Sequence, residues 1–105
     1  MSKKIVAVTA CIAGIAHTYM AAENLKKYAK KAGYEIKVET QGAMGIENQL
    51  KQKDIDEADI VIFAVDTTVS KAERFENKNV FKVGTSEVVK NGKAAIDGAI
   101  AAAQQ

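Results

Sequence analysis

Nearly continuous apolar runs mark two segments of this chain as buried strands. The segments Lys4–Thr9 (KIVAVT) and Asp59–Val65 (DIVIFAV) consist almost entirely of apolar residues, many of them β-branched. Runs of this kind are typical of central strands in a parallel sheet, where both faces are covered. A shorter segment of similar character, Asn79–Val83 (NVFKV), predicts a short last strand.

A further strand is predicted from strict alternation between polar and apolar positions. In Tyr34–Thr40 (YEIKVET) every second side chain is apolar or aromatic. This period of two indicates a half-exposed strand at the edge of a sheet. The face assigned to the core carries Tyr34, Ile36 and Val38, and the face assigned to solvent carries Glu35, Lys37 and Glu39.

The pattern changes to a helical period after Thr18. Lysines occupy one face of the predicted helix, and Gly33 stands where a helix favours a left-handed C-cap residue. The apolar face of this helix is predicted to carry Ala21, Leu25, Tyr28 and Ala32.

Weaker patterns predict the remaining helices. Ile46–Lys51 is compatible with a short helix, and the polar segment Asp66–Glu76 has some helical character. A final helix would begin at Thr85 or Ser86, either of which can act as an N-cap, and would be weakened at Asn91-Gly92. Its inner face is predicted to include Val89, Ile96, Ile100 and Ala103.

Strands therefore alternate with helices along a chain without prolines, repeats or linkers. This organisation predicts a single α/β domain over residues 1–105, built as a Rossmann-like three-layer sandwich. We expect a four-stranded parallel sheet with helices on both faces and, in order of predicted strands, the arrangement 2-1-3-4. In that arrangement the switch point lies beside the carboxyl end of the first strand, where such sheets bind ligands.

Composition and charge narrow the classes of function. Fifteen basic and 13 acidic side chains give a net charge of +2, which does not favour a nucleic-acid partner. The apolar runs are too short to cross a bilayer, and a single cysteine excludes an internal disulfide and a structural zinc site. We expect a cytoplasmic monomer without a metal or cofactor.

The segment that follows the first strand concentrates the reactive side chains. Cys11 and His17, the only cysteine and the only histidine, lie within VTACIAGIAHTYM, between a buried strand and a helix start. Backbone N–H groups at a helix N-terminus bind anions, and the same field favours a thiolate. A thiolate surrounded by such amides would accept a phosphoryl group. The residues assigned to phosphate binding are Ile12, Ala13, Gly14, Ile15, Ala16, His17 and Thr18.

Other interpretations of the same residues remain open at this point. The spacing C-x5-H is similar to the C-x5-R of cysteine phosphatases, so a small phosphatase or arsenate reductase is an alternative enzyme. A non-catalytic regulatory module is a second alternative. Cys11 could equally be an inert buried thiol, His17 a surface or capping residue, and Thr18 a simple N-cap.

Several separated motifs resemble one known family. VTACIAGIAHTYMAAENL resembles the active-site segment of fructose-type enzyme IIB components of the bacterial sugar phosphotransferase system, whose usual pattern is Val-Thr-Ala-Cys-Pro-Thr-Gly-Ile-Ala-His-Thr-Tyr-Met-Ala-Ala-Glu. IKVETQGAMG, DIDEADIVIFAVD and ERFENK are similar to three further motifs of that family, in the same order. The resemblance extends over nearly the whole chain.

This resemblance implies a phosphoryl carrier in sugar import. Cys11 would take a phosphoryl group from a phosphohistidine of the IIA component and pass it to a sugar, fructose or a fructose-like one, held by the membrane component IIC. Ile12 and Ala13 depart from the family pattern, which has proline and threonine there. Exposed residues at the ends of the second and third predicted strands are candidates for the partner surface, namely Gln41, Met44 and Asp66.

Overall fold

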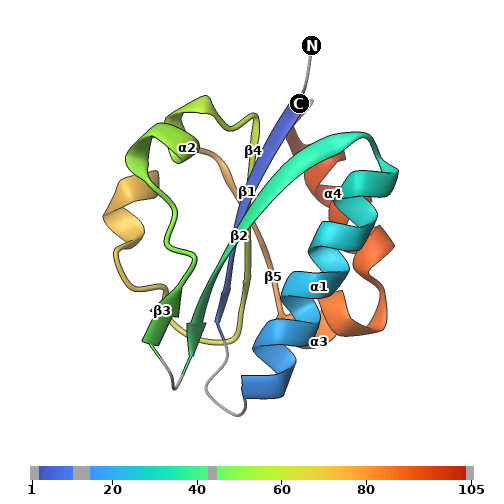
Figure 1. Cartoon of the computed structure of the whole chain (residues 1–105). Helices are drawn as coiled ribbons and strands as arrows, with labels where there is room; N and C mark the ends of the chain where they lie inside the picture. Colours follow the sequence, from blue (N-terminus) through green and yellow to red (C-terminus); the bar gives the residue numbers. More distant parts are fainter. Residues whose placement is uncertain (1–2, 11–14, 43–44, 104–105) are drawn as a thin grey trace.

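The computed structural model describes residues 3–10, 15–42 and 45–103, with the backbone alone at 15–17 (Figure 1). The elements on the amino-terminal half are β1 (Lys3–Ala10), α1 (Ile15–Lys31), β2 (Tyr34–Gly42), β3 (Gly45–Glu47) and α2 (Gln52–Glu57). They are followed by β4 (Ile60–Val65), the 3-10 helix η1 (Ala72–Phe75), β5 (Val80–Val83), α3 (Thr85–Lys90) and α4 (Gly92–Ala103).

The sheet has the order β3-β2-β1-β4-β5. The four strands expected from the sequence are β2, β1, β4 and β5, and they are parallel neighbours in the predicted order. The prediction of a purely parallel, four-stranded sheet is wrong, because β3 adds a fifth strand antiparallel to β2. β2 is consequently not an edge strand along its last residues, where Thr40 pairs with Glu47.

The prediction of a helix over Ile46–Lys51 is also wrong. Gly45 has a φ of +95°, Asn48 a φ of +54°, and the chain between them pairs with β2. Because positive φ values are incompatible with a right-handed helix, the helix α2 begins only at Gln52.

Helices cover both faces of the sheet, so the molecule has three layers (Figure 1). α1, α3 and α4 cover one face, over a core that includes Ile5, Leu25 and Ile96. α2 and η1 lie on the other face, over a second core that includes Phe63 and Phe75. Alternate side chains of β1 enter the two cores, as a strand covered on both faces requires.

The other predicted helices are present with shifted limits. α1 begins at Ile15 rather than after Thr18, so Thr18 lies within the helix and the N-cap interpretation is wrong. Gly33 has the positive φ expected of a C-cap, while Ala32 is exposed and outside the helix. The expected final helix is two helices, α3 and α4, which separate at Asn91.

The caps and faces of these last two helices also differ from expectation. Gly84, rather than Thr85 or Ser86, is the N-cap of α3. Ile96 is buried as predicted, whereas Ala103 is exposed. Within the described residues, no helix is both long and apolar enough to cross a membrane.

Candidate functional site

The carboxyl ends of the parallel strands meet at one edge of the sheet, at the bottom of Figure 1. β1 ends at Ala10 and α1 begins at Ile15 at this edge. β1 pairs on one side with β2, which follows α1, and on the other with β4, which follows α2. Because α1 and α2 lie on opposite faces, the end of β1 is the switch point of the sheet, as predicted.

The structure describes only some of the predicted site residues. Cys11, Ile12, Ala13 and Gly14, as well as Met44, lie outside the described residues. The backbone of Ile15, Ala16 and His17 forms the first turn of α1, whereas their side chains lie outside the description. α1 has 17 residues and no acidic residue in its first turn. The N–H groups of the first turn of a helix have no carbonyl partner within that helix, and the helix dipole gives them a partial positive charge.

Two threonine hydroxyls lie beside the helix start without a partner. Thr9, the penultimate residue of β1, is 0% exposed, and Thr18 is 1% exposed. Among the described residues, the Oγ1 atoms of these two threonines are the buried side-chain polar atoms without a hydrogen-bond partner. A buried hydroxyl without a partner is costly, so these two atoms need an explanation.

Asp66 connects three elements at the same edge. Its N–H donates to the carbonyl of Ala10 at 2.9 Å, which ties the segment after β4 to the end of β1. Its carboxylate accepts hydrogen bonds from the N–H of Thr85, at 3.2 Å, and from the Thr85 hydroxyl. A Cβ atom at Gly84 would lie 3.2 Å from this carboxylate. Asp66 therefore holds the start of α3 against the end of β4.

The sequence analysis missed a buried ion pair on the opposite face of the sheet. Glu39 was assigned to the solvent face of its strand, but its side chain is 0% exposed. Arg74 of η1 donates from Nη1 to Oε1 at 2.8 Å and from Nη2 to Oε2 at 3.0 Å. Leu50 N–H donates to Oε1 at 2.8 Å, and Gln41 Nε2 donates to Oε2 at 2.6 Å.

These hydrogen bonds determine the protonation of Glu39. Burial raises the pKa of Glu39, but the hydrogen bonds from Arg74, Gln41 and the Leu50 N–H outweigh burial and hold the pKa below its usual range. A carboxylate that accepts four charge-assisted or amide hydrogen bonds is satisfied in its ionised form. The signal in the sequence was the pair of motifs IKVETQGAMG and ERFENK, which supply the two partners.

Gln41 is part of this network and not an exposed contact residue. It is 8% exposed, which contradicts its prediction as a surface candidate. Its amide donates to the carbonyl of Ser70 at 3.0 Å and accepts from the N–H of Ser70 at 2.8 Å. Arg74 and Gln41 therefore fix the segment between β4 and η1 against β2.

This segment borders an open hollow on the η1 face, next to the switch point. The hollow has a volume of about 630 Å³. Phe63, Val65 and Val69 contribute apolar surface, and Thr67 and Lys82 contribute polar groups. The hollow contains no group of three or more histidine, cysteine, aspartate or glutamate side chains arranged for a metal, and neither does the rest of the described chain.

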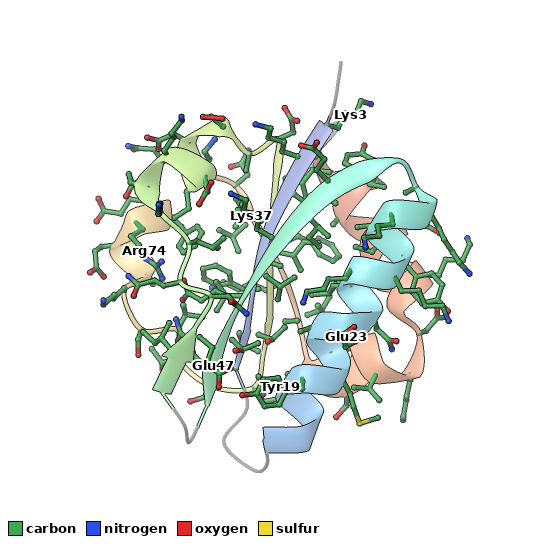
Figure 2. All side chains as sticks on the ribbon, viewed as in Figure 1. Lys3, Tyr19, Glu23, Lys37, Glu47 and Arg74 are labelled. Carbon is green, nitrogen blue, oxygen red and sulfur yellow. The ribbon has the colours of Figure 1, made fainter. Side chains whose placement is uncertain are left out.

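On the other side of the switch point, α1 is joined to the hairpin of β2 and β3. The Tyr19 hydroxyl donates to the Glu47 carboxylate, and the two side chains approach one another from α1 and β3 in Figure 2. The hydrogen bond to Glu47, together with partial burial and the carboxylate charge, raises the pKa of Tyr19. Tyr19 and its neighbour Met20 are the large apolar residues of the described chain that are most exposed, at 37% and 50%.

Comparisons with known proteins give consistent matches over most of the chain. A family model described as "PTS system, Lactose/Cellobiose specific IIB subunit" matches residues 6–98. The chain is 48% identical over 96 residues to the PTS system fructose-like EIIB component 1 of Escherichia coli (strain K12), with 91% of this chain and 89% of that protein covered.

Solved structures give the same picture. This chain is 46% identical to the protein in the solution structure of the enzyme IIB subunit of the PTS system from Escherichia coli K12. The TM-score is 0.90, and the match covers 100% of both chains. A crystal structure of a domain of the fructose-specific IIABC component from Borrelia burgdorferi is 48% identical with a TM-score of 0.89, and 94% of each chain is covered. The description of the family model mentions lactose and cellobiose, whereas the names of the Escherichia coli component and the Borrelia burgdorferi domain mention fructose.

Proposed function

This chain belongs to the PTS system IIB subunit family, and from that premise we propose that Cys11 carries a phosphoryl group from a IIA component to a sugar held by a IIC component. The chain acts in phosphoryl transfer during sugar import, in a system of the fructose-like type. The identity of the phosphorylated residue, the two partners and the sugar are the content of the proposal.

One observation carries the assignment of Cys11. The only thiol of the chain belongs to the residue that comes directly after β1 in the sequence, and a 17-residue helix begins four residues later. The carboxyl end of β1 is the switch point of the sheet. The partial positive charge at a helix N-terminus stabilises a thiolate relative to a neutral thiol. It also stabilises the negative charge of a bound phosphoryl group. The unpartnered hydroxyls of Thr9 and Thr18 at the same place support an oxyanion as ligand.

The proposed transfer has two steps. In the first, the Cys11 thiolate attacks the phosphorus of a phosphohistidine; the S–P bond forms, the N–P bond breaks, and the imidazole leaves neutral or takes up a proton. In the second, a sugar hydroxyl attacks the phosphocysteine; the O–P bond forms and the S–P bond breaks, the Cys11 sulfur leaves as a thiolate, and the proton of the sugar hydroxyl passes to solvent water. In both steps the amides of residues 12–18 would stabilise the equatorial oxygens, with His17 as part of the grip.

The chain's single arginine argues against a phosphatase. A cysteine phosphatase uses an arginine to hold the phosphate through two parallel hydrogen bonds. Arg74 is committed to Glu39 on the face of the sheet opposite α1, so it cannot supply this clamp at the N-terminus of α1. Residue 17, where that spacing would place the arginine, is a histidine.

An assay of phosphoryl transfer to a sugar tests the proposal. The chain is mixed with phosphoenolpyruvate, the two general phosphotransferase proteins, a cognate IIA component and membrane vesicles that contain the IIC component, and phosphorylated sugar is measured. Cys11→Ser should abolish sugar phosphorylation, because serine does not form a thiolate. Lys93→Gln, which removes an exposed charge of α4 that pairs with Asp97, serves as the control and should leave the rate unchanged. Undiminished sugar phosphorylation by Cys11→Ser would contradict the assignment.

A further inference from the structure

Among the described residues, four threonines are buried, and the three that are exposed by 1% or less differ in the hydrogen bonds of their hydroxyls. Thr9 and Thr85 are 0% exposed and Thr18 is 1% exposed. The Thr85 hydroxyl donates to the carboxylate of Asp66. The hydroxyls of Thr9 and Thr18 have no hydrogen-bond partner within the described part of the chain. Thr85 therefore provides an internal comparison for what a structural threonine does in this fold.

Thr9 and Thr18 occupy the same layer of the molecule. Alternate residues of β1 face α1, and Thr9 follows Ile5 and Ala7 on that side. Thr18 precedes Ala21 and Leu25 by three and seven residues, the spacing of the helix face that packs on the sheet. One hydroxyl thus comes from the carboxyl end of β1 and the other from the first turns of α1, on the inner side of the switch point.

An orphaned hydroxyl at this place is not explained by folding. An apolar side chain of the same shape, valine, would fill each position without the desolvation cost of a buried donor. A ligand whose binding supplies the missing partner would account for a threonine hydroxyl in such a place. The partial positive charge of the α1 N-terminus selects an anion as that ligand.

We propose that the hydroxyls of Thr9 and Thr18 form a paired donor site that binds two oxygens of a phosphoryl group at the N-terminus of α1. This proposal rests on the proposed function for the phosphoryl group and adds Thr9 as a binding residue. Both hydroxyls donate and the phosphoryl oxygens accept; no covalent bond changes at either threonine. The free protein bears the cost of two unpartnered hydroxyls, and phosphate binding removes it.

The first experiment uses the unphosphorylated chain and inorganic phosphate. Thr9→Val and Thr18→Val are compared with wild type by thermal unfolding and by phosphate titration, monitored through backbone amide shifts. We expect both variants to unfold at the same or a higher temperature than wild type, because each loses an unpartnered buried hydroxyl. We expect phosphate affinity to fall roughly tenfold to a hundredfold for each lost hydrogen bond to a charged oxygen. Thr9→Ser and Thr18→Ser, which keep the hydroxyl, should stay near the wild-type affinity.

Thr85→Val is the matched control. It removes a hydroxyl with a structural partner, so the unfolding temperature should fall while the phosphate affinity stays near wild type. If Thr9→Val and Thr18→Val behave like Thr85→Val, with lower unfolding temperatures and unchanged phosphate affinity, their hydroxyls are structural and the proposal is wrong. An internal water bridging the two hydroxyls would give this second pattern.

The second experiment separates this proposal from the proposed function. Wild type and the two valine variants are equilibrated with a phosphorylated IIA component, and the fraction of phosphorylated chain is measured. We expect each valine variant to shift the equilibrium toward the donor by roughly tenfold or more. If wild type accepts no phosphoryl group, the proposed function fails, while the phosphate titration still decides the role of the hydroxyl pair. If wild type and both valine variants are phosphorylated equally, the function stands and the hydroxyl pair is refuted.

Discussion

Replacement of Arg74 by methionine tests how the switch-point edge is held together. Methionine retains much of the length of arginine but donates no hydrogen bond, so Arg74→Met leaves the Glu39 carboxylate buried with half of its donors. The two hydrogen bonds that remain come from the N–H of Leu50 and the amide of Gln41. The hydrogen bonds from Arg74 to the carbonyls of Leu50 and Ser70, at 3.0 and 3.4 Å, are lost at the same time.

The structure sets the expected size of this effect. The Glu39 side chain is 0% exposed and the Arg74 side chain 12%, so solvent cannot replace the lost partner. Removal of one partner from a buried ion pair costs about 3–5 kcal/mol of unfolding free energy. That is a large share of the total for a domain of this size, roughly 5–15 kcal/mol. Because Tm falls by about 4–8 °C for each kcal/mol in a small domain, a loss of tens of degrees is expected.

Urea unfolding followed by circular dichroism measures the loss of unfolding free energy. A double variant shows how much of that loss comes from the unpaired buried charge of Glu39. In Glu39→Gln/Arg74→Met the buried charge is removed with its partner, so the double variant should be more stable than Arg74→Met alone. Lys93→Gln, which breaks an exposed ion pair with Asp97, is the surface control and should leave the urea midpoint unchanged. An Arg74→Met variant within about 0.5 kcal/mol of wild type would refute the argument that the ion pair fixes this edge.

The same variant should reverse the pH dependence of stability near the pKa of glutamate. In wild type the folded pKa of Glu39 lies below its unfolded value. Its contribution to stability is therefore complete above about pH 4.3, the unfolded pKa, and is lost as the pH falls through the folded pKa. In Arg74→Met we expect burial to outweigh the two remaining hydrogen bonds, from Gln41 and Leu50, and to raise the pKa of Glu39, so that stability rises as the pH falls toward about 4. Urea midpoints measured across this range check the sign.

Three further outcomes follow from individual contacts. Gly92→Ala should lower the unfolding free energy by about 1–3 kcal/mol in a denaturant titration, because the new Cβ would lie 2.8 Å from Cδ2 of Tyr28; wild-type stability would show that the ring moves freely. Glu47→Gln should lower the pKa of Tyr19 in an ultraviolet absorbance titration, since the carboxylate raises it; an unchanged titration would contradict the contact. The thiol of Cys11 should react with iodoacetamide with a pKa below that of a free thiol, about 8.5, and a value at or above that would weaken the case for a thiolate carrier.

Four of the five strands and their relative order were predictable because the strands follow from local pattern. Continuous apolar runs identified β1 and β4, and a sheet covered on both faces needs such runs at its centre. Alternation identified β2, and the change to a helical period identified α1. The alternation of strands and helices then restricted the topology to a parallel sheet with a switch point beside β1.

The parts that the sequence analysis missed depend on single backbone angles or on distant partners. β3 pairs with β2, and Gly45 and Asn48 at its two ends take positive φ values, which no periodic pattern reveals. Glu39 was assigned to the solvent face because it is charged, and only Arg74, 35 residues later, makes its burial possible. The composition of the chain does not show that its single arginine is bound to Glu39 and therefore absent from the candidate site.

The candidate site was also predictable only in part. The resemblance of VTACIAGIAHTYMAAENL to a known active-site segment identified the region, and the structure places the start of α1 and the end of β1 there. The pattern gave no indication that Thr9 and Thr18 are buried without a partner, because this property depends on packing between β1 and α1. Gln41 was chosen as a surface residue, but its amide is used by Glu39 and Ser70.

The central claim is that Cys11 carries the phosphoryl group, and one measurement tests it directly. The chain is incubated with a phosphorylated IIA component, and the intact mass and the modified residue are determined by mass spectrometry under conditions that preserve phosphocysteine and phosphohistidine. We expect a single added phosphoryl group on Cys11, absent from Cys11→Ser and present in Thr85→Val. A phosphoryl group found on His17, or one retained by Cys11→Ser, would contradict the account.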